Sequence, residues 1–81
     1  MDALLNVTVN GENGTLPDTV SFDAGDGDVK QWATEAVRSG GIPGITADSN
    51  ASFVDFVVDR FPAKDGLPAR LSLRPKTPFG V

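Results

Sequence analysis

The chain has 81 residues, of which 40% are apolar, and this is enough for a single small globular domain over residues 1–81. It contains neither Cys nor His, which excludes disulfides and the usual ligands of zinc, haem and iron–sulfur clusters, so we expect no metal and no cofactor. The net charge is −4, with ten acids and two bases in residues 1–59 but five bases and one acid in residues 60–81. The chain therefore lacks the overall basic surplus that is typical of a nucleic-acid binder.

The first third of the chain predicts a β-hairpin. Apolar and polar residues alternate in residues 4–11, as in a half-buried strand whose inward side chains are Leu5, Val7 and Val9. Asn13-Gly14 is a strong turn signal, and the alternation returns in residues 15–22. Pro17 cannot donate a hydrogen bond to a sheet ladder, so we expect this second strand at a sheet edge.

The acidic stretch "DAGDGD" at residues 23–28 raises the question of a calcium site. In an EF-hand loop that begins at Asp23, two ligand positions would be occupied by glycines, and the register that begins at Asp26 also fails. Acids before a helix N-terminus complement the helix dipole. We therefore interpret the stretch as the start of a helix, with Asp28 as its N-cap and Gln31 completing a capping box.

A helix is predicted to follow, because five apolar residues fall on one helical face: Val29, Trp32, Ala33, Ala36 and Val37. Trp32 lies in the middle of this stripe, and we expect its ring to be buried against inward side chains such as Val7, Val58 and Leu71. Gly40-Gly41 should end the helix, with Ile42 packing back onto it. A loop follows, in which Ile45 is the second apolar anchor.

Two further strands are predicted, over residues 52–61 and 69–75, separated by a turn at Asp65-Gly66. On the first of them, one face carries Val54, Phe56 and Val58, and the other carries Phe53, Val57 and Phe61. On the second, Leu71 and Leu73 should point inward, and Arg70, Ser72 and Arg74 outward. A short tail over residues 75–81 completes the chain.

One antiparallel register suits both faces of this second hairpin. It places Asp59 opposite Arg70, Asp55 opposite Arg74 and Val57 opposite Ser72. The arginines are then either cross-strand ion pairs or part of a recognition stripe formed by Arg60, Arg70, Arg74 and Lys76. The outward apolar residues either form a contact surface or are covered by the tail through Phe79.

Catalysis has little support. The chain has no His, Cys or Tyr, and its serines have no activating base beside them in the sequence. Asp55 and Asp59 would lie about 13 Å apart on a strand, which is too far for a carboxylate pair to share a proton. We expect that the protein is not an enzyme.

The location of the protein is suggested by what its sequence lacks. No run reaches the roughly 20 apolar residues of a membrane span, and the N-terminal residues do not form a signal peptide, because Asp2 takes the place of a basic segment. We expect a cytoplasmic protein, or a virion protein if it is phage-encoded. The Ala-, Asp-, Val- and Gly-rich composition is typical of a high-GC genome and favours a phage or bacterial source.

The predicted β-β-α-β-β order is the layout of the β-grasp fold. Residues 28–45, "DVKQWATEAVRSGGIPGI", resemble the helix and following turn of ubiquitin-like proteins, in which a helix ends at a Gly-Ile-Pro, here Gly41-Ile42-Pro43. The resemblance implies an α+β fold: a four-stranded mixed sheet with its first and last strands parallel and central, and one helix packed on one face. Ubiquitin-type modifiers and sulfur carriers end in Gly-Gly, whereas this chain ends in Gly80-Val81, so conjugation is not expected.

We expect a small non-enzymatic protein-binding module, an adaptor or an inhibitor, that uses the open face of its sheet to bind another protein. The candidate binding residues are Arg70, Ser72, Arg74, Phe53, Val57 and Arg60. One alternative is a phage virion or self-assembling structural protein, with contacts through edge strands or the tail. A second alternative is a ubiquitin-like modifier or carrier. A membrane is not an expected partner.

Overall fold

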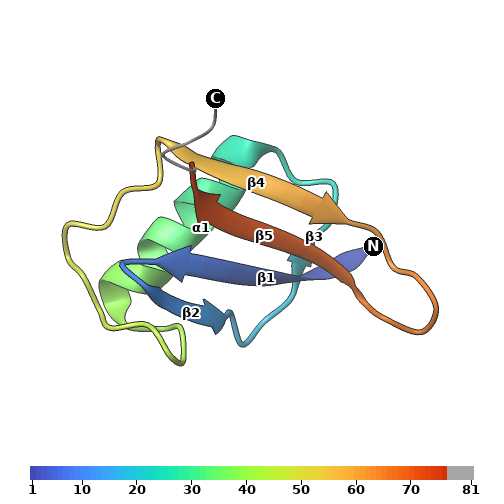
Figure 1. Cartoon of the computed structure of the whole chain (residues 1–81), viewed down its shortest axis with the longest axis horizontal. Coiled ribbons are helices and arrows are strands. Elements are labelled where there is room, and N and C mark those ends of the chain that lie inside the picture. Colours follow the sequence, from blue (N-terminus) through green and yellow to red (C-terminus); the bar gives the residue numbers. More distant parts are fainter. Residues whose placement is uncertain (77–81) are drawn as a thin grey trace.

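The computed structural model describes residues 1–76, and it is a small α+β domain with one helix and a mixed sheet. The sheet order is β2-β1-β5-β4, and a short strand β3 also pairs with β1. Strands β1 and β5 are central and parallel, as predicted (Figure 1). The strands are β1 Asp2–Val9, β2 Glu12–Thr15, β3 Val20–Ser21, β4 Phe56–Phe61 and β5 Ala69–Pro75, and the helix is α1 Asp26–Ser39.

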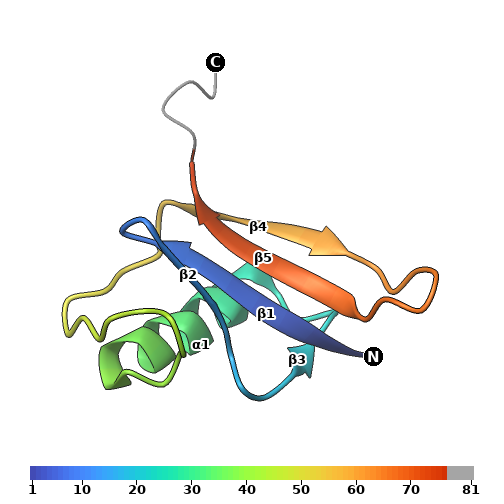
Figure 2. The ribbon, with the colours of Figure 1, turned by 60° about the horizontal axis from the view of Figure 1, so that its bottom comes forward.

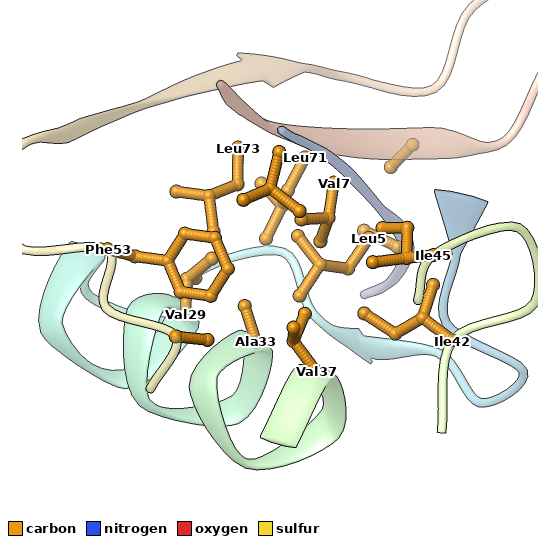
Figure 3. Close-up of a cluster of buried hydrophobic side chains, with 14 residues drawn as sticks. Leu5, Val7, Val29, Ala33, Val37, Ile42, Ile45, Phe53, Leu71 and Leu73 are labelled. Carbon is orange, nitrogen blue, oxygen red and sulfur yellow. The ribbon is translucent and has the colours of Figure 1, made fainter. Parts of the chain in front are cut away.

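The helix α1 lies across one face of the sheet (Figure 2), and the core fills the space between them. The predicted inward residues of β1 and β5 are buried, and Val29, Ala33 and Val37 meet them from the helix (Figure 3). Each large apolar side chain removed from water stabilises the fold by about 1.5–3 kcal/mol. Both loop anchors, Ile42 and Ile45, are also buried. The predicted inward faces of these elements are therefore confirmed.

The first hairpin turns three residues earlier than predicted. Its turn is Asn10-Gly11, where both residues have positive φ (51° and 77°), as a two-residue type I′ turn requires. Asn13-Gly14 lies inside β2 instead. Gly14 is needed there for a different reason, since a Cβ at this position would lie 2.2 Å from the carbonyl oxygen of Pro43. The sequence contains two Asn-Gly pairs, and either could form the hairpin turn. The packing of the loop after α1 against Gly14 decides that Asn10-Gly11 forms it.

The predicted second strand is interrupted, because residues 16–19 leave the ladder between β2 and β3. Pro17 lies in this break, and the segment lies at the sheet edge, as its proline requires. The outer side of β2 is covered by the loop that follows α1. There the Thr46 backbone N–H and hydroxyl donate to the two carboxylate oxygens of Glu12, at 2.9 Å and 3.0 Å.

The start of α1 differs from the prediction, and its end confirms it. The helix begins at Asp26, its N-cap is Gly25, and no side chain caps it, so the assignment of Asp28 as N-cap is wrong. Asp26 and Asp28 both lie in the first turn, where they complement the dipole. At the other end Gly40 is left-handed (φ 74°), which a residue without Cβ adopts at no steric cost.

The prediction for the first strand of the second hairpin is wrong in its first residues. β4 begins at Phe56, because the Phe56 N–H donates to the Phe53 carbonyl oxygen (2.9 Å) and the chain turns there. The turn ends the alternation, so Phe53 is buried in the core instead of lying on the open face, and Val54 is 75% exposed instead of inward. The Phe53 ring meets the Phe56 ring edge-on, with centroids 4.7 Å apart.

The register of β4 against β5 is shifted by two residues from the predicted one. Val57 lies opposite Arg74, Asp59 opposite Ser72, and Phe61 opposite Arg70. Because side chains alternate between faces with a period of two, such a shift keeps every residue on its predicted face while it changes every partner.

Trp32 packs against the core but is only partly buried, so the expectation that its ring is buried holds only in part. Val29, Ala33 and Val37 form the line of the helix that points at the sheet, and Trp32 lies to one side of that line. Within residues 1–76, the structure contains no helix that is long and apolar enough to cross a membrane.

Candidate functional site

The open face of the sheet, opposite α1, carries four of the six candidate residues. Arg70, Ser72 and Arg74 point outward from β5, since the residues between them are buried. Val57 lies directly opposite Arg74 and therefore on the same face, together with Asp59 and Phe61. The structure thus brings together Arg70, Ser72, Arg74 and Val57, and it separates Phe53 and Arg60 from them.

Arg60 lies on the helix side of β4, with the same parity as Phe56 and Val58. Its guanidinium donates to the Phe22 carbonyl oxygen (2.9 Å) and forms an ion pair with Asp26 (2.6 Å). Its assignment to an open-face recognition stripe is therefore wrong. The acidic stretch "DAGDGD" supplies this partner. Within residues 1–76, no three acidic side chains gather closely enough to hold a metal ion.

One end of the open face is a polar network within the sheet itself. The Asn6 side-chain amide donates to Asn13 Oδ1 (3.0 Å) and to the Thr15 hydroxyl (3.1 Å). The Asn13 amide donates back to Asn6 Oδ1 and to the Thr8 hydroxyl, both at 2.8 Å. These cross-strand bonds between β1 and β2 use the hydrogen-bonding groups that a ligand would need, so this end is structural.

Between β5 and the edge strand β4, the open face carries an ion pair. Arg74 Nε donates to Asp59 Oδ2 at 2.5 Å, and the two side chains are 41% and 35% exposed. The predicted pairs, Asp59 with Arg70 and Asp55 with Arg74, are wrong because of the two-residue shift in register. Arg74 therefore belongs to the ion-pair alternative. Arg70 has no carboxylate within ion-pair distance in the part of the chain that the structure describes.

The other end of the open face is an apolar depression of about 390 Å³, which we call the Phe61 depression. The Arg70 guanidinium lies over the Phe61 ring, 4.6 Å from its centroid. Phe61 is 43% exposed and Leu67 is 69% exposed. The other apolar residues of the depression are Leu4, Pro62 and Pro68, and its two charged residues are Lys64 and Arg70.

The loop that borders this depression is held by its own hydrogen bonds. Lys64 and Leu67 exchange backbone bonds of 3.2 Å and 2.8 Å across the turn at Asp65-Gly66. Both turn residues have positive φ (50° and 81°), so the predicted turn is confirmed and is of the tight two-residue kind. The depression is preformed on this side, and a ligand would not have to order the loop.

Sequence reasoning missed most of this depression. Leu4 has the outward parity of its strand, which was a usable signal, but its contribution depends on β1 lying beside β5. Leu67 lies between a glycine and a proline in a turn region, and no periodic pattern marks it. Of the residues that line the depression, the sequence analysis placed only Phe61 and Arg70 on this face.

Comparison with models of protein families, with curated proteins and with solved structures gives no match.

Proposed function

We propose that this protein is a small, non-enzymatic protein-binding module that acts through the open face of its sheet, at the Phe61 depression. The observation that carries the proposal is the pairing of exposed Phe61 with Arg70 in an apolar depression. Aromatic residues and arginine are the residue types most often found at the energetic centre of protein interfaces. A concave, preformed, apolar surface beside an arginine that has no carboxylate partner among residues 1–76 suits this use.

Charge indicates the kind of partner. The protein carries a net charge of −4, yet both charged residues that line the depression, Lys64 and Arg70, are basic. An apolar side chain alone would leave both cations without a counter-charge. We infer that the bound segment presents a large apolar side chain close to a carboxylate, so that the guanidinium of Arg70 can donate to it.

The fold supports the same proposal. A helix on one face of a mixed sheet, with β1 and β5 parallel and central, is the arrangement of the β-grasp fold, to which we propose the domain belongs. The sheet then serves as a rigid platform whose free face binds another protein.

Selection from a random-peptide display library on the immobilised protein tests this proposal. We expect the recovered peptides to carry a large apolar residue within a few positions of Asp or Glu. Arg70→Gln should weaken their binding about tenfold or more, which corresponds to about 1.4 kcal/mol. Arg74→Gln is the matched control, because it removes the same charge from the same strand and face but at an arginine paired with Asp59.

The proposal is tested by comparing how much each of the two arginine substitutions weakens peptide binding. Peptides that bind wild type and Arg70→Gln equally well, or that lose affinity only with Arg74→Gln, would place the binding surface elsewhere. Amide chemical shifts of the complex give an independent map, and we expect the changes to centre on Phe61 and Leu67. Changes confined to the Asn6–Asn13 end of the sheet would contradict the proposal.

A further inference from the structure

A second depression, of about 600 Å³, lies between α1 and the β2–β3 connection (residues 16–19), and we call it the Trp32 groove. Its apolar residues are Leu16, Val20, Trp32 and Ala36, and its two charged residues, Asp18 and Glu35, are both acidic. The charge of this groove is thus opposite to that of the Phe61 depression.

The Trp32 groove is open to a ligand. The Trp32 indole is half-buried, and both carboxylates are exposed. Neither Asp18 nor Glu35 has a cationic side chain within ion-pair distance among residues 1–76, and Glu35 only accepts a long bond of 3.5 Å from Gln31. A groove lined by an aromatic ring and two carboxylates favours a ligand that is apolar in part and positively charged in part.

The chain itself carries a segment of that chemistry. The hairpin of residues 62–68 reaches beyond the ends of β4 and β5 (Figures 1 and 2). It presents Leu67, which is 69% exposed, and the exposed amine of Lys64. The mutual backbone bonds of Lys64 and Leu67 hold the two side chains on one rigid turn, which lowers the entropy lost on binding.

We propose that copies of this protein associate head to tail. The 62–68 hairpin of one copy enters the Trp32 groove of the next, where Leu67 covers the indole and the Lys64 amine faces Asp18 and Glu35. The hairpin extends from the sheet, whereas the groove lies beside α1 on the helix side, so after one contact the first copy still has a free groove and the second copy still has a free hairpin. Such a heterologous contact builds open chains of copies rather than a closed dimer.

The contact is independent of the proposed function, since it does not require Phe61 or Arg70 to bind a partner. It is a small interface, of the size class that gives weak and transient association. It is also electrostatic in part, so it should weaken as salt screens the charges. Because Lys64 and Leu67 also border the Phe61 depression, a protein bound there would compete with chain growth.

Sedimentation velocity at low ionic strength, over a series of protein concentrations, tests the proposal with two charge-reversal variants. Lys64→Glu disables the hairpin and keeps the groove, and Glu35→Lys disables the groove and keeps the hairpin. Both residues are exposed, so the melting curves of the variants should match the wild-type curve. Lys76→Glu is the matched control, because it changes the net charge as Lys64→Glu does at an exposed residue outside both surfaces.

We expect the sedimentation coefficient of wild type and of Lys76→Glu to rise with concentration, while each of the other two variants alone remains monomeric. An equimolar mixture of Lys64→Glu and Glu35→Lys should associate, because the intact hairpin of one variant meets the intact groove of the other. Trp32 is the sole tryptophan, so its emission should shift to shorter wavelength on association. Asp65→Asn should strengthen association, because it removes an acid from the hairpin and Asn tolerates the positive φ.

Three outcomes would overturn the proposal. The first is a wild type that stays monomeric at about 1 mM, where even a contact of about 4 kcal/mol would be half-formed. The second is association of both single variants at the wild-type level. The third is a mixture of the two variants that stays monomeric.

Discussion

The guanidinium of Arg70 lies 4.6 Å from the ring centroid of Phe61, the residue directly opposite it on β4. The predicted register would have placed Asp59 opposite Arg70 and neutralised it. In the observed register the arginine lies over an aromatic ring, which attracts a cation without accepting its hydrogen bonds as a carboxylate would. Arg70 is therefore held in place and can still donate to a carboxylate of a partner.

This pairing predicts a measurable coupling between the two side chains. Phe61→Leu keeps an apolar side chain and Arg70→Gln keeps a polar one, so each mainly removes the ring–cation attraction. The double variant should lose about 0.5–1 kcal/mol less than the sum of the two single losses, the range known for exposed pairs of this kind. Urea melts followed by circular dichroism measure it. Strict additivity would show that the guanidinium and the ring do not interact.

Gly14 should be sensitive to the smallest substitution, even though its φ is not positive. An added Cβ would lie 2.2 Å from the Pro43 carbonyl oxygen and 2.8 Å from a methyl of Ile42, and the first of these is backbone that cannot step aside cheaply. We expect Gly14→Ala to cost about 1–3 kcal/mol, as overpacking does. Gly27→Ala, at a helical position with no atom within 4 Å, should stabilise by about 0.4–1 kcal/mol. Thermal melts that moved in the same direction for both variants would contradict this account.

Truncation of Phe53 should destabilise the protein more than truncation of Trp32. Phe53 is 1% exposed within the core, so Phe53→Ala should cost about 3–5 kcal/mol and largely unfold a domain of about 5 kcal/mol total stability. Trp32 is only partly buried at the edge of the core, so Trp32→Ala should leave a smaller cavity and cost less than Phe53→Ala. Urea midpoints from circular dichroism give the order directly. The reverse order would mean that Trp32, not Phe53, holds the helix to the sheet.

Substitution of the two acids at the start of α1 should lower the stability of the protein by different amounts. Asp26 forms the ion pair with Arg60 and is 61% exposed, so Asp26→Ala should cost at most about 1 kcal/mol. Asp28 caps nothing, and Asp28→Ala should change the free energy of unfolding by less than about 0.5 kcal/mol. The difference between the variants should shrink in 1 M salt, where the Debye length is about 3 Å. A larger loss for Asp28→Ala than for Asp26→Ala would restore Asp28 as the cap.

Alternation and turn chemistry predicted the elements, and much of what lies on each face, without any structure. The inward faces of β1 and β5, the end of the helix at Gly40 and the turn at Asp65-Gly66 were all predicted correctly. Each of these features depends on residues close together in the chain, because a strand buries every second side chain and a left-handed turn requires a residue that tolerates positive φ.

The candidate site was predicted only in part, because a site depends on which segments meet. Alternation placed Arg70, Ser72, Arg74 and Val57 on one face, but it could not assign a partner to any of them. A two-residue shift of register leaves every face unchanged, so the same pattern is compatible with Asp59 facing either Arg70 or Ser72. The difference decides which arginine is neutralised.

The sequence by itself therefore determined the order of the elements and the side of the sheet on which most of their residues lie, since period and turn preference are properties of a single segment. Tertiary structure alone decided which Asn-Gly pair turns, where Phe53 and Trp32 pack, that Arg60 reaches Asp26, and that Leu4 and Leu67 join Phe61 in one depression. These outcomes depend on contacts between residues distant in the chain, such as the approach of Pro43 to Gly14, and no local pattern contains their energies.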